Sequence, residues 1–239
     1  MVHEPEDATS MRMMLAAVSL LMSVVIPFAA LAQQSPDRFA RMVVLKPKPD
    51  HATEFTAGYK RHIAWHAEHG DPWTWYGWTF VLGDRIGQFM DGTFGHALGD
   101  FDHPLDPRGD SADNAANVMP HADFVSHGVY ERLEAASSGG PLPDDAPYLS
   151  LVTYSVVPGQ EQRFEETIAQ AAKHRGDVRV SWYRLQAGGA LPQYVLMWAA
   201  RSFSQGATKP ELALPAGLVH RIDSELLRFQ PEMSHMPRE

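Results

Sequence analysis

The sequence predicts an α+β fold in which one β-α-β-β-α-β unit occurs twice in tandem. The main observation is a repeat. Residues 40–55 (ARMVVLKPKPDHATEF) and 149–164 (LSLVTYSVVPGQEQRF) each contain a β-rich run, a proline, and a phenylalanine six residues after that proline. A second observation is the Ser-, Gly- and Pro-rich segment 134–147, which lies between the two repeats and is typical of a boundary. Repetition of these features in one order indicates that a single structural unit has been duplicated.

The remaining elements also follow in the same order in both halves. After each helical stretch, a Trp-Tyr pair starts the next strand, a hairpin partner follows, and a last strand-like run covers residues 129–135 or 226–232. We expect the second helix of each half to be short, because Pro120 and Pro215 interrupt it. A helix that returns the chain to a neighbouring strand, followed by a hairpin, is the ferredoxin-like arrangement of one sheet with both helices on one face.

An export signal is predicted at the start of the chain. Residues 15–28 form an apolar run too short for a comfortable bilayer span, with Arg12 before it and Ala30-Leu31-Ala32 after it as a cleavage pattern. We therefore expect a periplasmic or secreted protein that has no membrane contact after cleavage. The predicted division is a signal peptide (1–32), a first unit with an Asp- and His-rich loop insertion at 95–114 (33–136), a linker (137–147) and a second unit (148–239).

Composition excludes several classes of function. The 239 residues carry a formal charge of −9, and loss of residues 1–32, which hold three acidic residues and one arginine, leaves about −7. A mildly acidic exported protein is not expected to bind nucleic acid or anionic membranes. No cysteine is present, which excludes disulfides, thiolate metal ligands and a cysteine nucleophile. The GxSxG, Walker, GxGxxG, HExxH and CxxC motifs are also absent, so the sequence gives no support to a serine hydrolase, a nucleotide-binding protein or a zinc protease.

Three histidines fall at helical spacing in the stretch YKRHIAWHAEHG (residues 59–70). At about 100° per residue, His62, His66 and His69 lie within the apolar stripe that should face the sheet. The second repeat has Ala171 and Arg175 where the first has His62 and His66, so the fold itself does not require imidazole at these positions.

Three interpretations of these histidines stay open. They are structural and hydrogen-bonded, or they bind a transition metal, or one of them serves a haem-like or organic-ligand pocket. An i, i+4 pair on a helix suits Zn²⁺ or Cu²⁺, so His62, His66 and His69 are the candidate metal ligands, and His62 and His66 are also the candidate catalytic residues. A further ligand could come from His96 or His103 if segment 95–114 forms a lid.

Aromatic residues crowd the region that follows this helix. Two-residue periodicity places Trp73 and Trp75 on one face of the next strand and Tyr76 and Trp78 on the other. One pair would line a site for a planar ligand while the other faces a partner sheet. With Tyr59 from the helix, these four residues are the candidate substrate-binding residues.

The strand, the turn Pro-Gly-x-Glu-x-x-Phe (residues 158–164), the helix and the hairpin together resemble the dimeric α/β barrel superfamily. That superfamily includes antibiotic-biosynthesis-type monooxygenases, haem-degrading monooxygenases and chlorite dismutase relatives. The resemblance implies two sheets packed face to face as a barrel, closed either within one chain or in a homodimer. Together with the predicted export signal, the resemblance implies an exported small-molecule-binding protein with a planar or aromatic ligand in a helix–sheet pocket of the first unit. If the protein is an enzyme, the resemblance implies a monooxygenase-like oxidoreductase acting on that ligand.

Two alternatives to that function remain. One is a non-catalytic binding or interaction module of the same fold, and the other is a haem- or transition-metal-binding protein. The cofactor is correspondingly none, haem or a transition metal, and the resemblance does not decide whether the protein is an enzyme. Trp198 and His220 lie roughly where the haem-degrading branch has its tryptophan and histidine, but that branch also needs an asparagine, and Thr153 is the nearest polar residue here.

Overall fold

The computed structural model describes residues 37–138, 146–174, 179–208 and 212–237. The predicted signal peptide and most of the predicted linker lie outside these ranges. The first half contains β1 (Phe39–Pro47), α1 (Ala52–Glu68), β2 (Tyr76–Leu82), β3 (Phe89–His96), the 3₁₀ helix η2 (Leu98–Asp102), α2 (Pro107–Asn117) and β4 (Ala122–Arg132). The second half contains β5 (Tyr148–Val156), α3 (Glu161–Ala172), β6 (Ser181–Ala187), β7 (Gln193–Ala200), α4 (Phe203–Ala207), β8 (Val219–Phe229) and the 3₁₀ helix η3 (Pro231–Met233).

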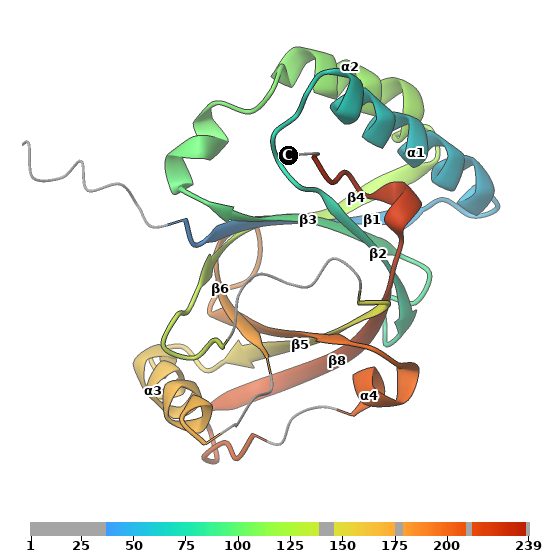
Figure 1. The fold of residues 1–239 in the computed structure, drawn as a ribbon. Coiled ribbons are helices and arrows are strands. Elements are labelled where there is room, and N and C mark those ends of the chain that lie inside the picture. Colours follow the sequence, from blue (N-terminus) through green and yellow to red (C-terminus); the bar gives the residue numbers. More distant parts are fainter. Residues whose placement is uncertain (1–36, 139–145, 175–178, 209–211, 238–239) are drawn as a thin grey trace, which may run out of the picture. The chain divides into compact units, whose positions relative to one another are not determined.

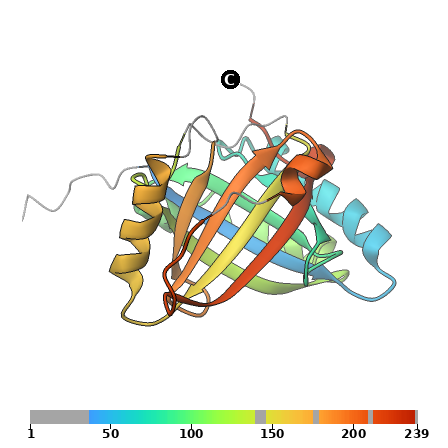
Figure 2. The same ribbon diagram turned by 90° about the horizontal axis from the view of Figure 1, so that it is seen from below.

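The eight strands form one closed antiparallel barrel in the order β1-β3-β2-β8-β5-β7-β6-β4. Each half contributes four neighbouring strands, β4-β1-β3-β2 and β8-β5-β7-β6, and pairing of β2 with β8 and of β4 with β6 joins the two sheets. This is the predicted tandem of ferredoxin-like units, and it closes within a single chain (Figures 1 and 2). A homodimer stays a prediction.

Side chains that alternate along the strands build an inner core and two outer cores. Met42 and Val44 of β1 point into the barrel, where residues of both halves meet, whereas Val43 and Leu45 point outward beneath α1. Helices α1 and α2 cover the outer face of the first sheet, and α3 covers that of the second (Figure 1). Among the described residues, no helix has the length and apolarity needed to cross a bilayer.

The turn into α1 explains the proline motif shared by the repeats. Asp50 follows Pro49 with φ of 63°, and Gly159 follows Pro158 with φ of 85°, so both turns use the left-handed region that aspartate tolerates and glycine prefers. The helix then buries one side against the sheet, as its periodicity predicts, and its buried residues are Phe55, Gly58, Tyr59, His62, Ile63 and His66.

Residues 95–114 were predicted to form a loop insertion, and this prediction is wrong for the second part of the segment, which is helical. Residues 107–117 form α2, which begins with Pro107 at its first position and an Asp106 cap that accepts a hydrogen bond from the Gly109 amide. The helix was missed because none of its residues is buried and it has no apolar stripe. It ends at Asn117, so Pro120 lies beyond it.

Helix α2 lies unusually close to α1, and a glycine permits that approach. A Cβ at Gly58 would lie 1.9 Å from the carbonyl oxygen of Asn117 at the end of α2. The Arg61 side chain stabilises the same contact, because its Nε donates a hydrogen bond to Asn117 Oδ1 over 2.7 Å. The two helices are therefore held side by side, which sets the distance between the functional groups that they carry.

Two further boundaries differ from the sequence prediction. β4 and β8 begin at Ala122 and Val219, earlier than the strand-like runs at 129–135 and 226–232. His220 consequently lies exposed on a strand rather than on a helix. Trp198 belongs to the outer core of the second half.

Candidate functional site

A cavity of about 280 Å³ lies between the outer face of the first sheet and the two helices α1 and α2. Strands β1 and β3 provide its floor, including Arg41 and Asp91. Helix α1 provides one wall, and residues 104–114 provide the opposite one. Trp73 and Trp75 line one end. This places the cavity in the helix–sheet position of the first unit.

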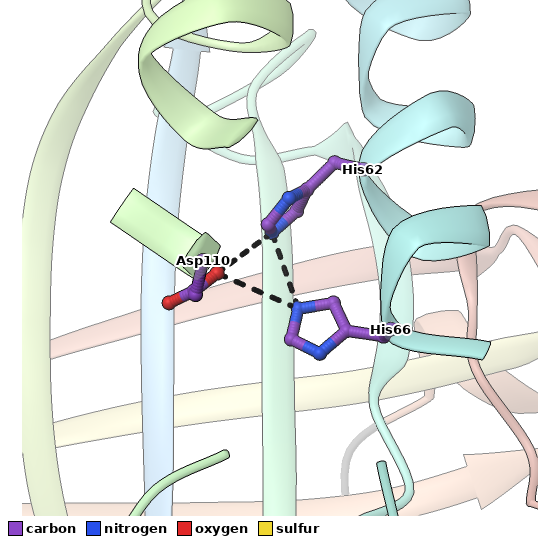
Figure 3. Close-up of side chains that lie close together, drawn as sticks. All are labelled: His62, His66 and Asp110. Carbon is purple, nitrogen blue, oxygen red and sulfur yellow. Dashed lines mark hydrogen bonds and ion pairs between the residues drawn. The ribbon is translucent and has the colours of Figure 1, made fainter. Parts of the chain in front are cut away.

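His62 and His66 are both buried in the wall that α1 provides, at 6% exposure each. Their Nε2 atoms lie 3.3 Å apart. The Asp110 Oδ1 atom, from α2, lies 3.6 Å from the first and 3.7 Å from the second (Figure 3). Two imidazoles and one carboxylate from two helices therefore point at one spot beside the cavity.

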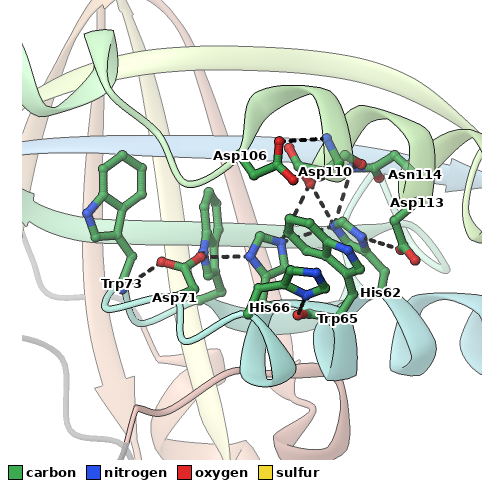
Figure 4. A network of polar contacts seen from close by, with 12 residues as sticks. His62, Trp65, His66, Asp71, Trp73, Asp106, Asp110, Asp113 and Asn114 are labelled. Atoms are coloured by element: carbon green, nitrogen blue, oxygen red, sulfur yellow. Dashed lines mark hydrogen bonds and ion pairs between the residues drawn. The ribbon is translucent and has the colours of Figure 1, made fainter.

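The opposite nitrogen of each ring is bonded to a different carboxylate. His62 Nδ1 lies 2.8 Å from Asp113 Oδ2, and His66 Nδ1 lies 2.7 Å from Asp71 Oδ2 (Figure 4). A carboxylate can only accept a hydrogen bond, so each Nδ1 donates. Such outer carboxylates fix the tautomer and the orientation of metal-binding histidines.

Asp71 is itself firmly held. Its Oδ1 accepts from the Trp73 amide at 2.9 Å, and its Oδ2 also accepts from the Trp75 indole at 2.9 Å. Burial alone would raise the pKa of Asp71, but the hydrogen bonds from His66 and the two tryptophans together lower it below its ordinary value. The side chain is therefore an anion that orients His66.

These bonds leave three acceptors facing one another. When each Nδ1 carries the hydrogen, both neutral rings present an Nε2 lone pair, and the third group is the Asp110 oxygen. Burial lowers the pKa of His62, against the opposing hydrogen bond to Asp113, and so favours the neutral ring. Asn114 Nδ2 carries two hydrogens and can donate one to His62 Nε2 at 3.3 Å and the other to Asp110 Oδ1 at 3.0 Å, so in this state His66 Nε2 is the ring nitrogen without a donor among the described residues. Convergent lone pairs of this kind call for a cation, either a proton or a metal ion.

The spacing of the three atoms suits a metal ion. Atoms at separations of 3.3, 3.6 and 3.7 Å are all about 2.0 Å from one common point, close to the 2.0–2.2 Å typical of Zn²⁺ bound to imidazole and carboxylate. His62, His66 and Asp110 also form the cluster of possible metal ligands found among the described residues. Three protein ligands would leave at least one coordination position for a molecule in the cavity, which the same three residues line.

The cavity floor holds a second polar group. Tyr59 donates from its hydroxyl to Asp91 Oδ2 over 2.7 Å. Burial raises the pKa of Asp91 to about 6, although this hydrogen bond and the charge of Arg41 oppose the rise. Burial is also the main cause of the raised pKa of Tyr59. This part of the site was not predicted, since nothing in the sequence links Asp91 to Tyr59 before the strand register is known.

The structure separates the predicted aromatic residues into two groups. Trp73 and Trp75 precede β2 and line the cavity, as does Tyr59. Tyr76 and Trp78 do not line it. They lie on the opposite face of β2, inside the barrel, with their rings 5.4 Å apart. Two-residue alternation along the chain is the cause, and it assigns the second pair to the inner core.

His69 does not join the other two histidines. Helix α1 ends at Glu68, and His69 is exposed at its cap, where it stacks on Trp65 at 4.2 Å between ring centroids and bonds the Trp65 carbonyl at 2.8 Å. Its predicted place in the apolar stripe is wrong because the helix ends before it. Asp110 takes the third position instead.

The two histidines of the 95–114 segment are also elsewhere. His96 is buried beside Thr93, with its Nε2 2.5 Å from the threonine oxygen, and its ring packs 4.5 Å from that of Trp73. His103 is exposed. Neither reaches the cluster formed by His62, His66 and Asp110.

The corresponding positions in the second half lack this chemistry. The register pairs Val43 with Asp91 in the first half and Val152 with Leu196 in the second, so Leu196 corresponds to Asp91. Ile168 corresponds to Tyr59, because each lies four residues after the first buried phenylalanine of its helix. Both replacements are fully packed and apolar. Arg175, which the repeat aligns with His66, lies outside the described residues.

Comparison with known proteins supports the fold. No protein-family model matches the sequence, and no curated protein matches it. Among solved structures, a "putative monooxygenase" from Lactobacillus acidophilus NCFM is similar with a TM-score of 0.54 and 11% identity, over 85% of this chain and 97% of that chain. An anthrone oxidase-like protein is similar with a TM-score of 0.54 and 11% identity, over 81% and 92% of the two chains. A mutant chlorite dismutase from Candidatus Nitrospira defluvii has a TM-score of 0.52 and 11% identity, over 83% and 94%.

At this level of identity the likeness concerns the fold. The chain has the fold of the dimeric α/β barrel superfamily, with both ferredoxin-like units in one polypeptide.

Proposed function

We propose that this protein binds a divalent transition metal ion through His62, His66 and Asp110, and that it acts as a monooxygenase-like oxidoreductase on a small planar molecule held in the adjoining cavity. The observation that carries the proposal is the convergence of three acceptor atoms within 3.7 Å of one another, with both imidazoles braced from behind by carboxylates. The two carboxylates fix both rings with their Nε2 atoms turned toward Asp110, which is the orientation that metal binding requires.

The ligand set supports an oxidoreductase. Two histidines and one carboxylate with open positions are typical of non-haem iron oxygenases, and three protein ligands with one open position also occur in zinc enzymes. Solved proteins of similar fold are named as a monooxygenase, an anthrone oxidase-like protein and a chlorite dismutase, which agrees with oxidative chemistry. In this proposal dioxygen is the oxidant when the ion is iron: one oxygen atom enters the ligand, and two electrons and two protons, taken from the ligand itself or from an external reductant, convert the other to water.

The cavity supports a small ligand. Its volume of about 280 Å³ falls just below the 300–1,000 Å³ typical of ligand pockets, which favours a ligand of one or two rings over a haem macrocycle. Trp73 and Trp75, which line the cavity and whose rings lie 6.1 Å apart between centroids, would pack against the flat face of such a ligand.

A second candidate is a non-catalytic binding module. The 3.3 Å separation of the two Nε2 atoms is compatible with a shared proton as well as with a metal ion. In that case the histidines would only stabilise the wall of the cavity. The two candidates differ in metal content, which can be measured directly.

The test is elemental analysis of protein purified without a polyhistidine tag, followed by titration of the metal-free protein with Fe²⁺, Zn²⁺ and Cu²⁺. We expect about one ion per chain, with binding lost in His62→Ala, His66→Ala and Asp110→Ala. His69→Ala is the matched control, because this exposed histidine lies on the same helix end and should leave the stoichiometry unchanged. The proposal would be excluded if the metal-free protein took up no ion in the titration. It would also be excluded if all four variants bound the ion equally.

Export is proposed separately. Cleavage after Ala32 would give a mature chain that begins with Gln33. Mass measurement of the protein recovered from a periplasmic or culture fraction tests this directly, and an intact chain confined to the cytoplasm would contradict it.

A further inference from the structure

We infer that Asp91 and Arg41 form a ligand-recognition pair on the cavity floor, and that the ligand is a hydroxylated aromatic acid whose hydroxyl donates to Asp91 while its carboxylate meets Arg41. This inference names the substrate class for the cavity and in that sense rests on the proposed function. It depends on atoms other than those proposed to bind the metal.

The first observation is an unpartnered oxygen. Asp91 is 7% exposed, and Tyr59 satisfies its Oδ2. Its Oδ1 is buried and has no hydrogen-bond partner among the described residues, although Asp91 lines the cavity. A buried acceptor without a donor is costly, and such groups in native proteins call for an explanation. A donor carried by a bound molecule supplies one.

The second observation concerns Arg41, because most hydrogen-bond donors of its guanidinium group have no acceptor among the described residues. Arg41 lines the same floor, and its guanidinium packs 5.6 Å from the Trp75 ring and 5.8 Å from the Phe101 ring. Only its Nε makes a hydrogen bond within the described part of the chain, to His127 Nε2 at 3.1 Å. The two terminal nitrogens, which form the fork that binds a carboxylate in bidentate fashion, have no acceptor there.

Arg41 and Asp91 do not satisfy each other. The strand register pairs Arg41 with Thr93 and Val43 with Asp91, so the two charged residues are diagonal neighbours on one face of the sheet. The charge of each acts on the pKa of the other, but no hydrogen bond or ion pair within 4.0 Å joins them among the described residues. The Asp91 carboxylate and the Arg41 guanidinium therefore lie at separate places on the cavity floor, near the end that Trp73 and Trp75 line.

The second half provides an internal control. Its positions equivalent to Tyr59 and Asp91 are Ile168 and Leu196, which pack in an apolar core. The barrel therefore folds without a buried carboxylate in this place. The polar floor is therefore a local feature of the first half, and ligand recognition gives it a role.

The geometry determines the ligand chemistry. Asp91 Oδ1 can only accept while ionised, so the ligand must carry a donor, and Arg41 can only donate, so the ligand must carry an anionic oxygen. The two tryptophans that line one end of the cavity favour a planar ring as the spacer. A hydroxybenzoate combines these three features, and no bond needs to form or break for recognition.

The test uses metal-free wild-type protein with four probes: 3-hydroxybenzoate and 4-hydroxybenzoate, and their methoxy counterparts, which lack the donor. Quenching of tryptophan fluorescence and calorimetry report binding. We expect at least one hydroxy acid to bind ten-fold or more tightly than its methoxy counterpart, because a site built to receive a hydroxyl rejects the analogue that leaves its acceptor unpaired.

Two variants and one control assign the effect. In Asp91→Asn the amide can still accept from Tyr59 but would present its NH₂ group to the cavity, so the preference for hydroxyl should disappear or reverse. Arg41→Gln should weaken all four acids alike. Asp123→Asn, an exposed carboxylate on β4, is the matched control and should behave as wild type.

The outcomes separate this inference from the metal proposal. Equal affinity of wild type for hydroxy and methoxy probes, no binding of any probe, or an unchanged preference in Asp91→Asn each overturns it. If the preference depends on Asp91 while the protein binds no metal, the recognition pair stands and the proposed metal centre fails. If Asp91→Asn keeps full metal binding while losing the preference, the two sites are distinct, as inferred.

Discussion

The Nε2 atoms of His62 and His66 lie 3.3 Å apart while the Nδ1 atom of each ring bonds a different carboxylate. The carboxylates come from separate segments, Asp113 from α2 and Asp71 from the turn after α1. The positions of both rings are therefore set by the packing of α2 and of that turn, and not by α1 alone. Four predictions follow from this dependence and from the cavity floor.

Asp113→Asn should weaken metal binding by about 10- to 100-fold, the usual effect of removing a carboxylate that orients a ligating histidine. The amide is similar in size but no longer enforces an Nδ1 hydrogen on His62. Metal affinity measured by competition with a chromophoric chelator checks this. Asp123→Asn serves as the control, and equal affinities of both variants would show that the Asp113 contact does not position His62.

Gly58→Ala should destabilise the protein by roughly 1–3 kcal/mol, the usual range for overpacking a tight contact. An alanine inside a helix is ordinarily better than glycine by about 0.5–1 kcal/mol, but here its Cβ would meet the Asn117 carbonyl at 1.9 Å. Displacement of α2 should also move Asp110 and Asp113 and so weaken metal binding. Urea unfolding checks the sign, and a stabilised variant with unchanged affinity would contradict the close helix contact.

Asp91→Asn should change how stability depends on pH. Because the folded pKa of about 6 exceeds the ordinary 3.8, the folded protein keeps a proton on Asp91 that the unfolded chain has already released between these values. Stability contributed by this group is therefore present below about pH 4 and lost as the pH rises to about 6, by up to roughly 3 kcal/mol. The asparagine variant avoids that loss.

The measurement is the difference in free energy of unfolding between Asp91→Asn and wild type at pH 4.5 and pH 7.5. The variant should gain stability relative to wild type at the higher pH. A difference independent of pH would mean that the pKa of Asp91 is not raised in the folded protein.

His235→Ala should cost about 1 kcal/mol of stability and also weaken metal binding. His235 Nε2 bonds the Asp71 backbone oxygen at 2.8 Å, and its backbone pairs with that of Trp75. Losing the side-chain bond removes a typical hydrogen-bond contribution and loosens the turn that holds Asp71 against His66. Chemical denaturation and the chelator assay test both effects. Loss of stability with unchanged metal affinity would show that the turn keeps its position without His235.

The sequence was sufficient for the scaffold and for one wall of the site. The periodicity of α1 puts Tyr59, His62 and His66 on the side that faces the sheet, because Phe55 and Ile63 define that side. The same reasoning failed for His69, since it assumed that the helix continued past Glu68. A helix end depends on the cap and on tertiary contacts, which the pattern of apolar residues does not record.

The opposite wall could not be predicted. Asp110 and Asp113 become partners of the histidines only if residues 107–117 form a helix, and that helix has no buried residue whose spacing would signal it. Its position depends on the contact between Gly58 and Asn117, which are distant in sequence. The role of Asp91 could not be predicted either, because its hydrogen bond with Tyr59 follows only once the position of β3 beneath α1 is known.

The segment that follows β8 makes the duplicated halves unequal. It leaves the second half, crosses to the first, and reaches Gly77, Trp75 and Asp71 through Ser234 and His235. The first copy thus holds the candidate site, and the segment that follows the last strand of the second copy supports the turn beside it. A polypeptide cut between β4 and β5 and produced as two fragments should regain an intact Asp71 turn only when the fragments reassociate, so such a split pair would work as a reporter of complementation.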